Sequence, residues 1–203
     1  MGGDGFFLWM GDDMLLTSVN STRSDPVLEP VSVAELQAHS KIDDPENQSN
    51  LESLVTAARQ AIEEGHLWRV TVNQTCIDKF GWFSSQMELR WSPVQSITSV
   101  QYVDTDGVTQ TLSTDIYELG EISGIGVVRL KDSQSWPSIQ SHEDTVTITY
   151  VAGYGSSPDD VPLPIRQAIL IYANWLYVAR EGEGGPFETL NALLQPCSAH
   201  REI

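Results

Sequence analysis

Two amphipathic stretches, far apart in the sequence, most constrain what this chain can fold into. In the first, residues 51–64, the apolar residues recur at helical spacing and form one stripe: Leu51, Leu54, Val55, Ala58 and Ile62. The second, residues 164–180, carries a similar stripe: Ile165, Ala168, Ile169, Tyr172, Trp175, Leu176 and Ala179. Neither helix can bury its stripe alone, so we expect the two to pack on each other. The sequence between them is then an excursion from a helical base.

Local signals set the expected ends of the first helices. Ser49 and Glu52 have the spacing of a capping box, which predicts that the first long helix begins there. Gly65 is the expected stop, since glycine is common just after a helix. A second capping box, Ser32 with Glu35, predicts a short preceding helix.

The sequence between the long helices changes its apolar period to two, which is typical of strands. We expect strands near residues 70–77, 87–91, 97–103, 109–112, 127–131 and 145–151, and a hairpin at Asp104–Gly107. The predicted class is α+β, a small antiparallel helical core of N-terminal and C-terminal helices with an inserted antiparallel β-domain. The expected division is an N-terminal arm or mis-assigned start (1–26), a helical core with a C-terminal docking tail (27–66 and 161–203), and the inserted β-domain (67–160).

The first residues have an unusual pattern. An apolar run, Phe6–Met10, is surrounded by Asp4, Asp12 and Asp13, and it lacks the basic start, the longer apolar core and the cleavage site of a signal peptide. Met14 opens a more conventional beginning with strand-like alternation. Either Met14 is the natural start or residues 1–13 form a loose arm. Mass spectrometry of the protein made from its native gene context distinguishes the two.

Charge and composition narrow the class of function. The chain has 28 acidic and 11 basic residues and a net charge of −17, which would repel a phosphate backbone and disfavours sequence-specific nucleic-acid binding. The acidity serves either solubility or a surface that stays near DNA without adhering to it. No stretch approaches the roughly 18 apolar residues of a membrane span. Cys76 and Cys197 lack the spacing of a zinc site and are expected to be separate thiols in a reducing cytoplasm.

Motifs for catalysis are missing from the sequence. The four histidines are scattered, and no zinc-protease motif, nucleophile elbow, Walker loop or dinucleotide fingerprint occurs. We therefore expect no enzyme, no cofactor and no metal site. One alternative stays open, a small enzyme or carbohydrate-binding module that uses the aromatic β region, with Trp82, Trp91 and Trp136 lining a groove. Tryptophans also serve as anchors in cores and interfaces.

Five segments, in order, carry a family resemblance. They are EPVSVAELQAHSKID (29–43), LVTAARQAIEE (54–64), SPVQSITSVQYVDTDG (92–107), DTVTITYVAGYG (144–155) and VPLPIRQAILIYANWLY (161–177). Together they resemble the head–tail connector (adaptor, or head-completion) proteins of long-tailed bacteriophages, over roughly residues 14–180. The β region is long and Trp-rich for this group, and the Met1–Asp13 lead departs from it.

The resemblance implies a structural virion protein of the neck, made in the host cytoplasm. Proteins of this group are expected to have a helical core with a β insertion. They are thought to form a homo-oligomeric ring, typically twelve-fold, beneath the portal protein, where the ring extends the DNA channel. Other neck, stopper or tail-completion proteins would be further partners. DNA would pass through without sequence-specific binding.

Two site hypotheses follow from this resemblance. The first places part of the negative charge on the channel lumen, with the candidates Asp43, Asp44, Glu46, Glu63 and Glu64. The second concerns a short amphipathic piece after the glycine-rich residues 181–186, which would dock on the portal or on a neighbouring subunit through Pro186, Phe187, Leu190, Leu193 and Leu194. The alternative for this tail is that it folds back on its own core.

Overall fold

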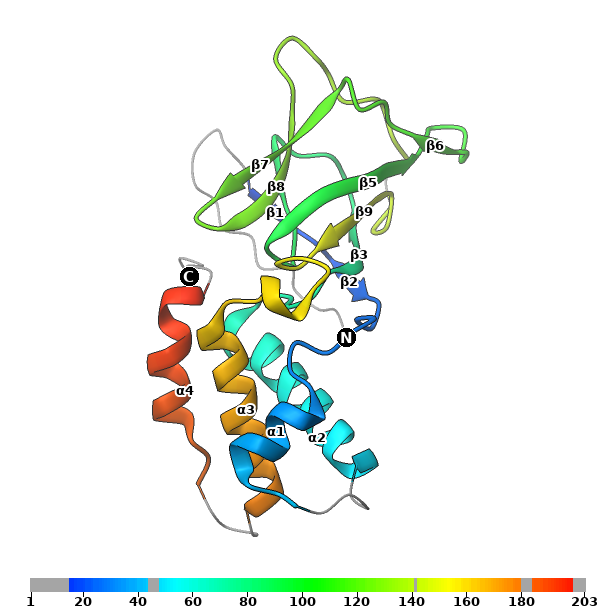
Figure 1. Ribbon diagram of the computed structural model, residues 1–203. Helices are drawn as coiled ribbons and strands as arrows, with labels where there is room; N and C mark the ends of the chain where they lie inside the picture. Colours follow the sequence, from blue (N-terminus) through cyan, green and yellow to red (C-terminus); the bar gives the residue numbers. More distant parts are fainter. Residues whose placement is uncertain (1–14, 44–47, 141, 180–183, 199–203) are drawn as a thin grey trace. The chain divides into compact units, whose positions relative to one another are not determined.

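The computed structural model describes residues 15–43, 48–140, 142–179 and 184–198, and the chain forms two compact units (Figure 1). The β unit is built from the segment that ends at Ser24 and from residues 74–152. The helical unit is built from residues 25–73 and from the segment that begins at Gly153. The helices and the mainly antiparallel sheets confirm the predicted α+β class.

Within the described residues, the helical unit contains four α-helices and three shorter helical turns. The α-helices are α1 (Val33–Ser40), α2 (Gln48–Ile62), α3 (Leu163–Val178) and α4 (Phe187–Leu194). The shorter turns are the π-helical η2 (Glu63–Leu67), which continues α2, and the 3₁₀ turns η3 (Pro158–Asp160) and η4 (Gln195–Cys197). Figure 1 shows α3 between α4 and α1 within this unit.

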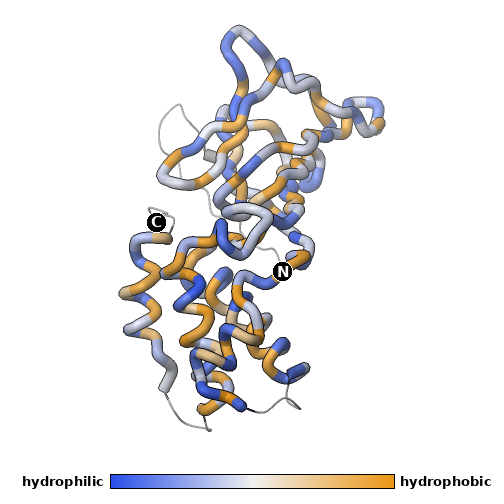
Figure 2. Tube along the Cα trace, viewed as in Figure 1, coloured by the Kyte–Doolittle hydropathy of each residue, from blue (hydrophilic) through white to orange (hydrophobic). Residues whose placement is uncertain are grey.

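The predicted packing of the two long helices is confirmed, because α2 and α3 contact each other and share one core. The shared core buries most of both apolar stripes, and α1 and α4 add to it; it includes Leu36, Leu51, Val55, Ala58, Ile62, Ile165, Ala168, Ile169, Ala173, Leu190 and Leu194. Figure 2 shows α3 as apolar along most of its length. This helix is covered from several sides, since α1, α2 and α4 all contact it.

Helix ends follow the sequence at one position and depart from it at two. The capping box at α1 is confirmed: the Ser32 hydroxyl accepts a hydrogen bond from the Glu35 amide (3.2 Å), and the Ser32 amide donates to Glu35 Oε2 (2.8 Å). The predicted box at Ser49 is wrong, because α2 begins at Gln48 and Ser49 lies inside the helix. Gly65 does not end the helix either: the π-helical turn runs through it to Leu67 and is followed by Trp68, whose φ is 52°.

The described part of the β unit forms two sheets. The four-stranded sheet has the order β1-β4-β8-β7, and the five-stranded sheet has the order β2-β3-β9-β5-β6. The strands are β1 (Leu15–Thr17), β2 (Asn20–Arg23), β3 (Gln74–Phe80), β4 (Gln86–Glu88), β5 (Val94–Val103), β6 (Thr109–Thr111), β7 (Tyr117–Ile122), β8 (Ile125–Leu130) and β9 (Val146–Ala152). The pairings between these strands are antiparallel except that of β1 with β4, which is parallel.

Strand β9 is the centre of the five-stranded sheet. Its alternating residues Val146, Ile148 and Tyr150 are fully buried, as the period-two pattern predicts. The predicted hairpin between β5 and β6 is also present. There Gly107 has a φ of 80°, and Asp104 Oδ1 accepts hydrogen bonds from the Asp106 and Val108 amides (3.0 and 2.9 Å).

The boundaries of the units differ from the expected ones. Residues 67–73 and 153–160 belong with the helices rather than with the β unit, because their backbones pair: the Asn73 amide donates to the Gly155 carbonyl, and the Tyr154 amide donates to the Thr71 carbonyl (both 2.9 Å). At the other end, the segment expected to be an arm supplies β1 and β2 to the sheets. The choice between a mis-assigned start and a loose arm concerns residues that lie outside the described ones.

Candidate docking and channel surfaces

Glu63 is fully buried, so its assignment to an exposed channel surface is wrong. Its Oε2 accepts a hydrogen bond from Arg59 Nη1 (2.9 Å), and its Oε1 accepts from the amide and the hydroxyl of Thr71 (2.9 and 2.7 Å). Arg59 is itself 2% exposed, and its Nε lies 2.8 Å from Glu29 Oε2. A buried carboxylate with these partners holds elements together, because each of its oxygens is hydrogen-bonded.

This cluster explains why the chain after α2 follows its path. Glu63 is the first residue of the π-helical turn, and Thr71 lies beyond the end of that turn. The hydrogen bonds from Thr71 to Glu63 hold the residues after the turn against the end of α2. Gly65 makes no comparable contact through a side chain. The i, i+4 spacing of Arg59 and Glu63 is the one sequence signal that pointed to this pair.

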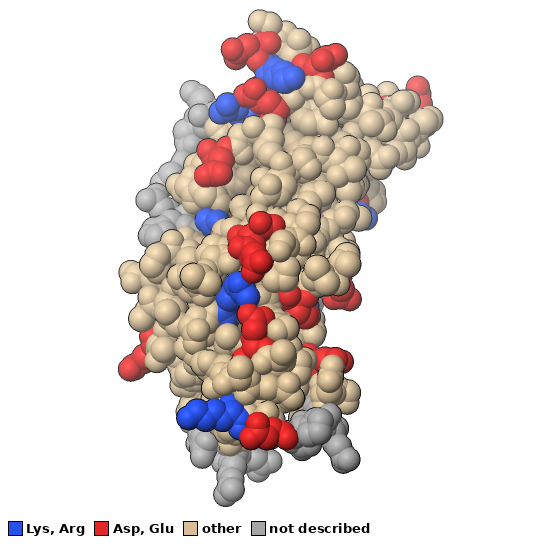
Figure 3. Space-filling model, in the orientation of Figure 1, with Lys and Arg blue, Asp and Glu red and all other residues tan. Residues whose placement is uncertain are grey.

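The other acidic candidates have different outcomes. Asp43 and Glu64 are exposed. Asp44 and Glu46 lie outside the described residues. On the face drawn in Figure 3, acidic side chains are spread over the surface rather than gathered in one patch. The channel hypothesis therefore keeps Asp43 and Glu64 as side chains that solvent or DNA can reach.

The C-terminal piece forms helix α4, which packs against α3 and η2. Leu190 is fully buried and Leu194 is 2% exposed, so both belong to the core of their own chain and their assignment as docking residues is wrong. The alternative prediction, a tail that folds back on its own core, therefore holds for the buried side of α4. Phe187 remains 48% exposed, and Pro186 and Leu193 are half-buried.

Phe187 belongs to a row of rings that we call the aromatic row: Tyr172, Trp175, Phe187 and His66. The ring centroids of Phe187 and Trp175 are 6.4 Å apart, and those of Phe187 and His66 are 6.3 Å apart with 24° between the planes. Tyr172 follows 5.3 Å from Trp175. Beside the row, a recess of about 330 Å³ is lined by His66, Asn191, Ala192, Leu194, Gln195 and Ser198. Half-exposed aromatic side chains over a concave surface are typical of protein interfaces.

The tryptophans of the β region do not form the groove that the alternative function needs. Trp91 is 6% exposed and lies under two guanidinium groups, those of Arg23 (4.4 Å) and Arg90 (5.3 Å). Trp136 stacks on Phe83 with its ring plane 3° from parallel, and its Nε1 donates to the Ser84 carbonyl. Trp82 is the one of the three that is largely exposed, at 39%.

A second buried carboxylate, Asp78, lies in the β unit and was not found by sequence reasoning. Its Oδ1 accepts from the Ser21 hydroxyl, and its Oδ2 accepts from the Arg90 amide (2.7 Å) and the Tyr150 hydroxyl (2.9 Å). Burial raises the pKa of Asp78, and these hydrogen bonds partly oppose the shift. Burial, followed by the charge of Asp78, also raises the pKa of Tyr150. The pair joins β2, β3 and β9 and is enclosed, so its role is structural.

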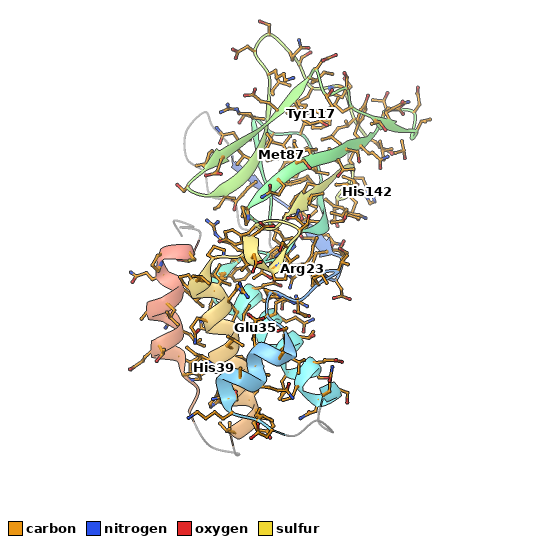
Figure 4. All side chains as sticks on the ribbon, in the orientation of Figure 1. Arg23, Glu35, His39, Met87, Tyr117 and His142 are labelled. Carbon is orange, nitrogen blue, oxygen red and sulfur yellow. The ribbon has the colours of Figure 1, made fainter. Side chains whose placement is uncertain are left out.

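Metal-binding and catalytic clusters were not expected. Within residues 15–43, 48–140, 142–179 and 184–198, no group of three or more histidine, cysteine or acidic side chains could hold a metal ion. Figure 4 shows His39 on α1 and His142 in the β unit. Cys76 and Cys197 are both free. No helix in the described part of the chain is long and apolar enough to cross a membrane.

Comparisons with known proteins give a consistent result. A model of the head completion protein family matches residues 29–174. Among solved structures, a chain from the neck of an empty gene transfer agent (GTA) particle computed with C6 symmetry has a TM-score of 0.76 and 19% identity, and the match covers 91% of this chain and 98% of that one. A chain from the virion of a native GTA particle gives 0.74 and 20%, with 90% and 97% covered.

A third solved chain, from the neck of a native GTA particle computed with C12 symmetry, has a TM-score of 0.72 and 20% identity, with 91% of this chain and 98% of that one covered. At these identities the solved chains establish similarity of fold. No curated protein matches the chain.

Proposed function

The chain belongs to the head completion protein family, and we propose that it is a non-enzymatic structural subunit of a virion neck that joins head to tail. The observation that carries the proposal is the extent of the family match, which runs from residue 29 to residue 174 and so includes elements of both units. The fold likeness to neck chains over nine-tenths of the sequence supports it.

The assembly that fits this role is a homo-oligomeric ring beneath the portal protein. The neck structures that contain chains of similar fold were computed with C6 and C12 symmetry, which supports a ring of about a dozen copies. DNA would pass through the ring, and stopper or tail-completion proteins would follow on its far side. The place of action is the neck of the virion, after synthesis in the host cytoplasm.

The negative charge has a purpose in such a ring. A basic channel would bind DNA by releasing the counterions of its phosphates, and an acidic channel avoids that attraction. Of the residues proposed to line the channel, Asp43 and Glu64 are described and have exposed carboxylates. The variant D43N/E64Q should slow or reduce DNA ejection from assembled particles. Unchanged ejection would exclude these two residues from the channel wall.

The aromatic row is the proposed contact with the portal or with a neighbouring subunit. Phe187 is the member of the row that lies on α4, and it is 48% exposed, whereas Leu190 holds α4 to the core and should be left intact. We expect F187A to preserve the melting temperature within a few degrees and to weaken attachment. The matched control is T189A on the exposed side of the same helix, which should attach normally.

The decisive experiment is the native mass of the purified protein, alone and mixed with the portal protein of the same virion. A ring of about a dozen copies, free or only on the portal, is the expected result. A monomer that ignores the portal and is stabilised by an added oligosaccharide would instead favour a carbohydrate-binding module.

A further inference from the structure

The segment that leads into α1 presents two exposed apolar side chains, which we call the apolar tip. Val27 is 93% exposed and Leu28 is 51% exposed. Pro26 precedes this pair and Pro30 follows shortly after it, and each proline restricts the backbone to a narrow range of φ. Two apolar side chains that stay in water on a restricted backbone leave the free energy of their burial unused.

The residues after the apolar tip hold it in place. Glu29 Oε1 accepts a hydrogen bond from the Thr56 hydroxyl (2.9 Å), and Glu29 Oε2 accepts one from Arg59 Nε (2.8 Å), so the residue next to Leu28 is fixed to α2. Pro30 and Val31 are buried immediately afterwards. A segment that is ordered before it binds loses little conformational freedom on binding. The apolar tip is therefore pre-organised for a contact.

The backbone of the apolar tip is also available to a partner. Among the described residues, the amides and carbonyls of Val27 and Leu28 make no hydrogen bond within the chain. Each amide can donate to an acceptor on a neighbouring molecule, and each carbonyl can accept from a donor there. A surface that fits the tip should therefore combine an apolar wall with polar side chains that donate and accept.

The recess beside the aromatic row combines these two kinds of side chain. Ala192 and Leu194 contribute apolar atoms to its lining, and Asn191 and Gln195 contribute exposed side-chain amides. Asn191 Oδ1 lies 3.2 Å from Nδ1 of His66, which leaves the NH₂ group of Asn191 to donate. Gln195 offers both a donor and an acceptor. The recess therefore suits the side chains of the tip and its backbone.

Charge favours the recess over other surfaces of a second copy. The net charge of each chain is −17, and Asp25 lies close to the apolar tip, so most of the surface of another copy would repel this segment. None of the described residues that line the recess is acidic. His66 in the lining can carry a positive charge. Two acidic chains can therefore meet here with little local repulsion.

The apolar tip and the recess lie on opposite sides of the helical unit. In Figure 1, α4 forms one side, and the segment that leads into α1 lies on the other side, beside α2, to which Glu29 is bound. A contact between two different surfaces is heterologous, and such contacts close into a ring when the rotation fits a full turn. In a ring of about a dozen copies the rotation is about 30°, so the surfaces that meet lie on nearly opposite sides of each subunit.

We propose that the apolar tip of one copy binds in the recess of the next copy, and that this contact repeats around the ring. The inference rests on the proposed ring and assigns the surfaces through which its subunits meet. Val27 and Leu28 pack against the apolar wall, and the amides of Asn191 and Gln195 bind the backbone of the tip. The aromatic row then borders a neighbouring subunit rather than the portal.

Cross-linking with a short bismaleimide, in the presence of the portal protein, tests the contact directly. The variant C197S removes the half-buried thiol next to the recess, and Cys76 is buried. In this background, L28C/A192C should give a ladder of covalently joined subunits, because each chain contributes one cysteine to each of two contacts. L28C alone should give no cross-link. A covalent dimer of L28C alone, or assembled rings of L28C/A192C without a ladder, would overturn the proposal.

The variant V27S/L28S tests the energetic importance of the tip. Native mass over a dilution series with the portal should show that half-assembly needs at least about a tenfold higher concentration than in the original protein. Its melting temperature should stay within a few degrees, because both side chains are exposed. The control V19S/V108S removes two exposed valines from the β unit and should assemble normally.

Two kinds of failure are distinguishable in this experiment. If V27S/L28S assembles like the original protein, the tip is not the contact, and the proposed ring stands without it. If the original protein forms no ring even with the portal, the proposed function itself fails, and the contact fails with it.

Discussion

Each unit contains a fully buried carboxylate, Glu63 in the helical unit and Asp78 in the β unit, and the two have different partners. In the helical unit, Glu63 faces the guanidinium of Arg59, which also reaches Glu29. In the β unit, Asp78 faces two hydroxyl groups and one amide instead, and burial raises its pKa. Glu63 therefore depends on a charged partner, whereas the hydrogen-bond donors of Asp78 are neutral. We therefore expect the larger stability loss from removing a partner of Glu63, and a pH-dependent contribution to stability from Asp78.

The largest expected effect is in the helical unit. R59M removes the cation and leaves the carboxylate of Glu63 buried without its charged partner, which should cost about 3–5 kcal/mol of unfolding free energy. Urea unfolding of the full chain measures this. The double variant R59M/E63L removes both charges and should recover much of the loss. If R59M and R59M/E63L were equally destabilised, packing rather than charge would hold this cluster.

The next effect is in the β unit. D78N keeps the size of the side chain but replaces one acceptor oxygen by an NH₂ group that faces donors, so we expect a loss of about 1–3 kcal/mol. The sign of the pH dependence follows from the raised pKa. Between the unfolded and the folded pKa the native state binds more protons, so the stability that Asp78 contributes is largest at low pH and falls as pH rises through the folded pKa. As the pH is lowered, the unfolding free energy of the original protein should rise relative to that of D78N. A difference in unfolding free energy that does not change with pH would contradict the assignment.

The third effect in order of size concerns an exposed ion pair in the β unit. Lys79 Nζ lies 3.2 Å from Asp144 Oδ2, and both side chains are about two-fifths exposed. K79M should change the unfolding free energy by less than about 1 kcal/mol, because solvent screens the pair. A cost comparable to that of R59M would mean that burial does not govern the strength of ion pairs in this protein.

The smallest expected effect concerns the pH response of α1. Burial alone would raise the pKa of Glu35, but the hydrogen bonds from Ser32 and the charge of Arg166, 2.5 Å away, lower it below its ordinary value of 4.5. A carboxylate with a lowered pKa adds stability above its unfolded pKa and loses it as the pH falls through the folded one. Stability curves of the original protein and E35Q should therefore converge in acid below about pH 4. Parallel curves would remove Glu35 from the pH response.

The sequence predicted the helices and strands that have a regular apolar pattern. It did not predict residues whose burial depends on partners far away in the sequence. The helices around Leu51 and Ile165 and the strand around Ile148 follow their patterns, because one-sided burial leaves a regular trace. Strand β7 left no such trace, since its sequence YELGEI has little alternation, and the polar β2 left none either.

The site residues show the same limit. Glu63 and Glu64 are adjacent and identical in the sequence, yet one is fully buried and the other exposed. The difference depends on Thr71 and Arg59, and only the second of these lies at a spacing that the sequence displays. Likewise, the burial of Leu190 and Leu194 depends on α3, which no local pattern in the tail reveals.

The pairing of residues 71–73 with 154–155 has a consequence for how such a chain can diversify. The segment that leaves the helical unit and the segment that returns to it run side by side. Gly153, with a φ of 138°, lies so close to Asn73 that a Cβ on Gly153 would be 2.5 Å from the amide nitrogen of Asn73. The entrance and the exit of the insertion are thus held together by the helical unit itself. Segments between Asn73 and Gly153 that do not pair with β1 or β2 can therefore be lengthened or shortened while the ends of the insertion stay together, which makes them the natural place to acquire a new surface without rebuilding the helical unit.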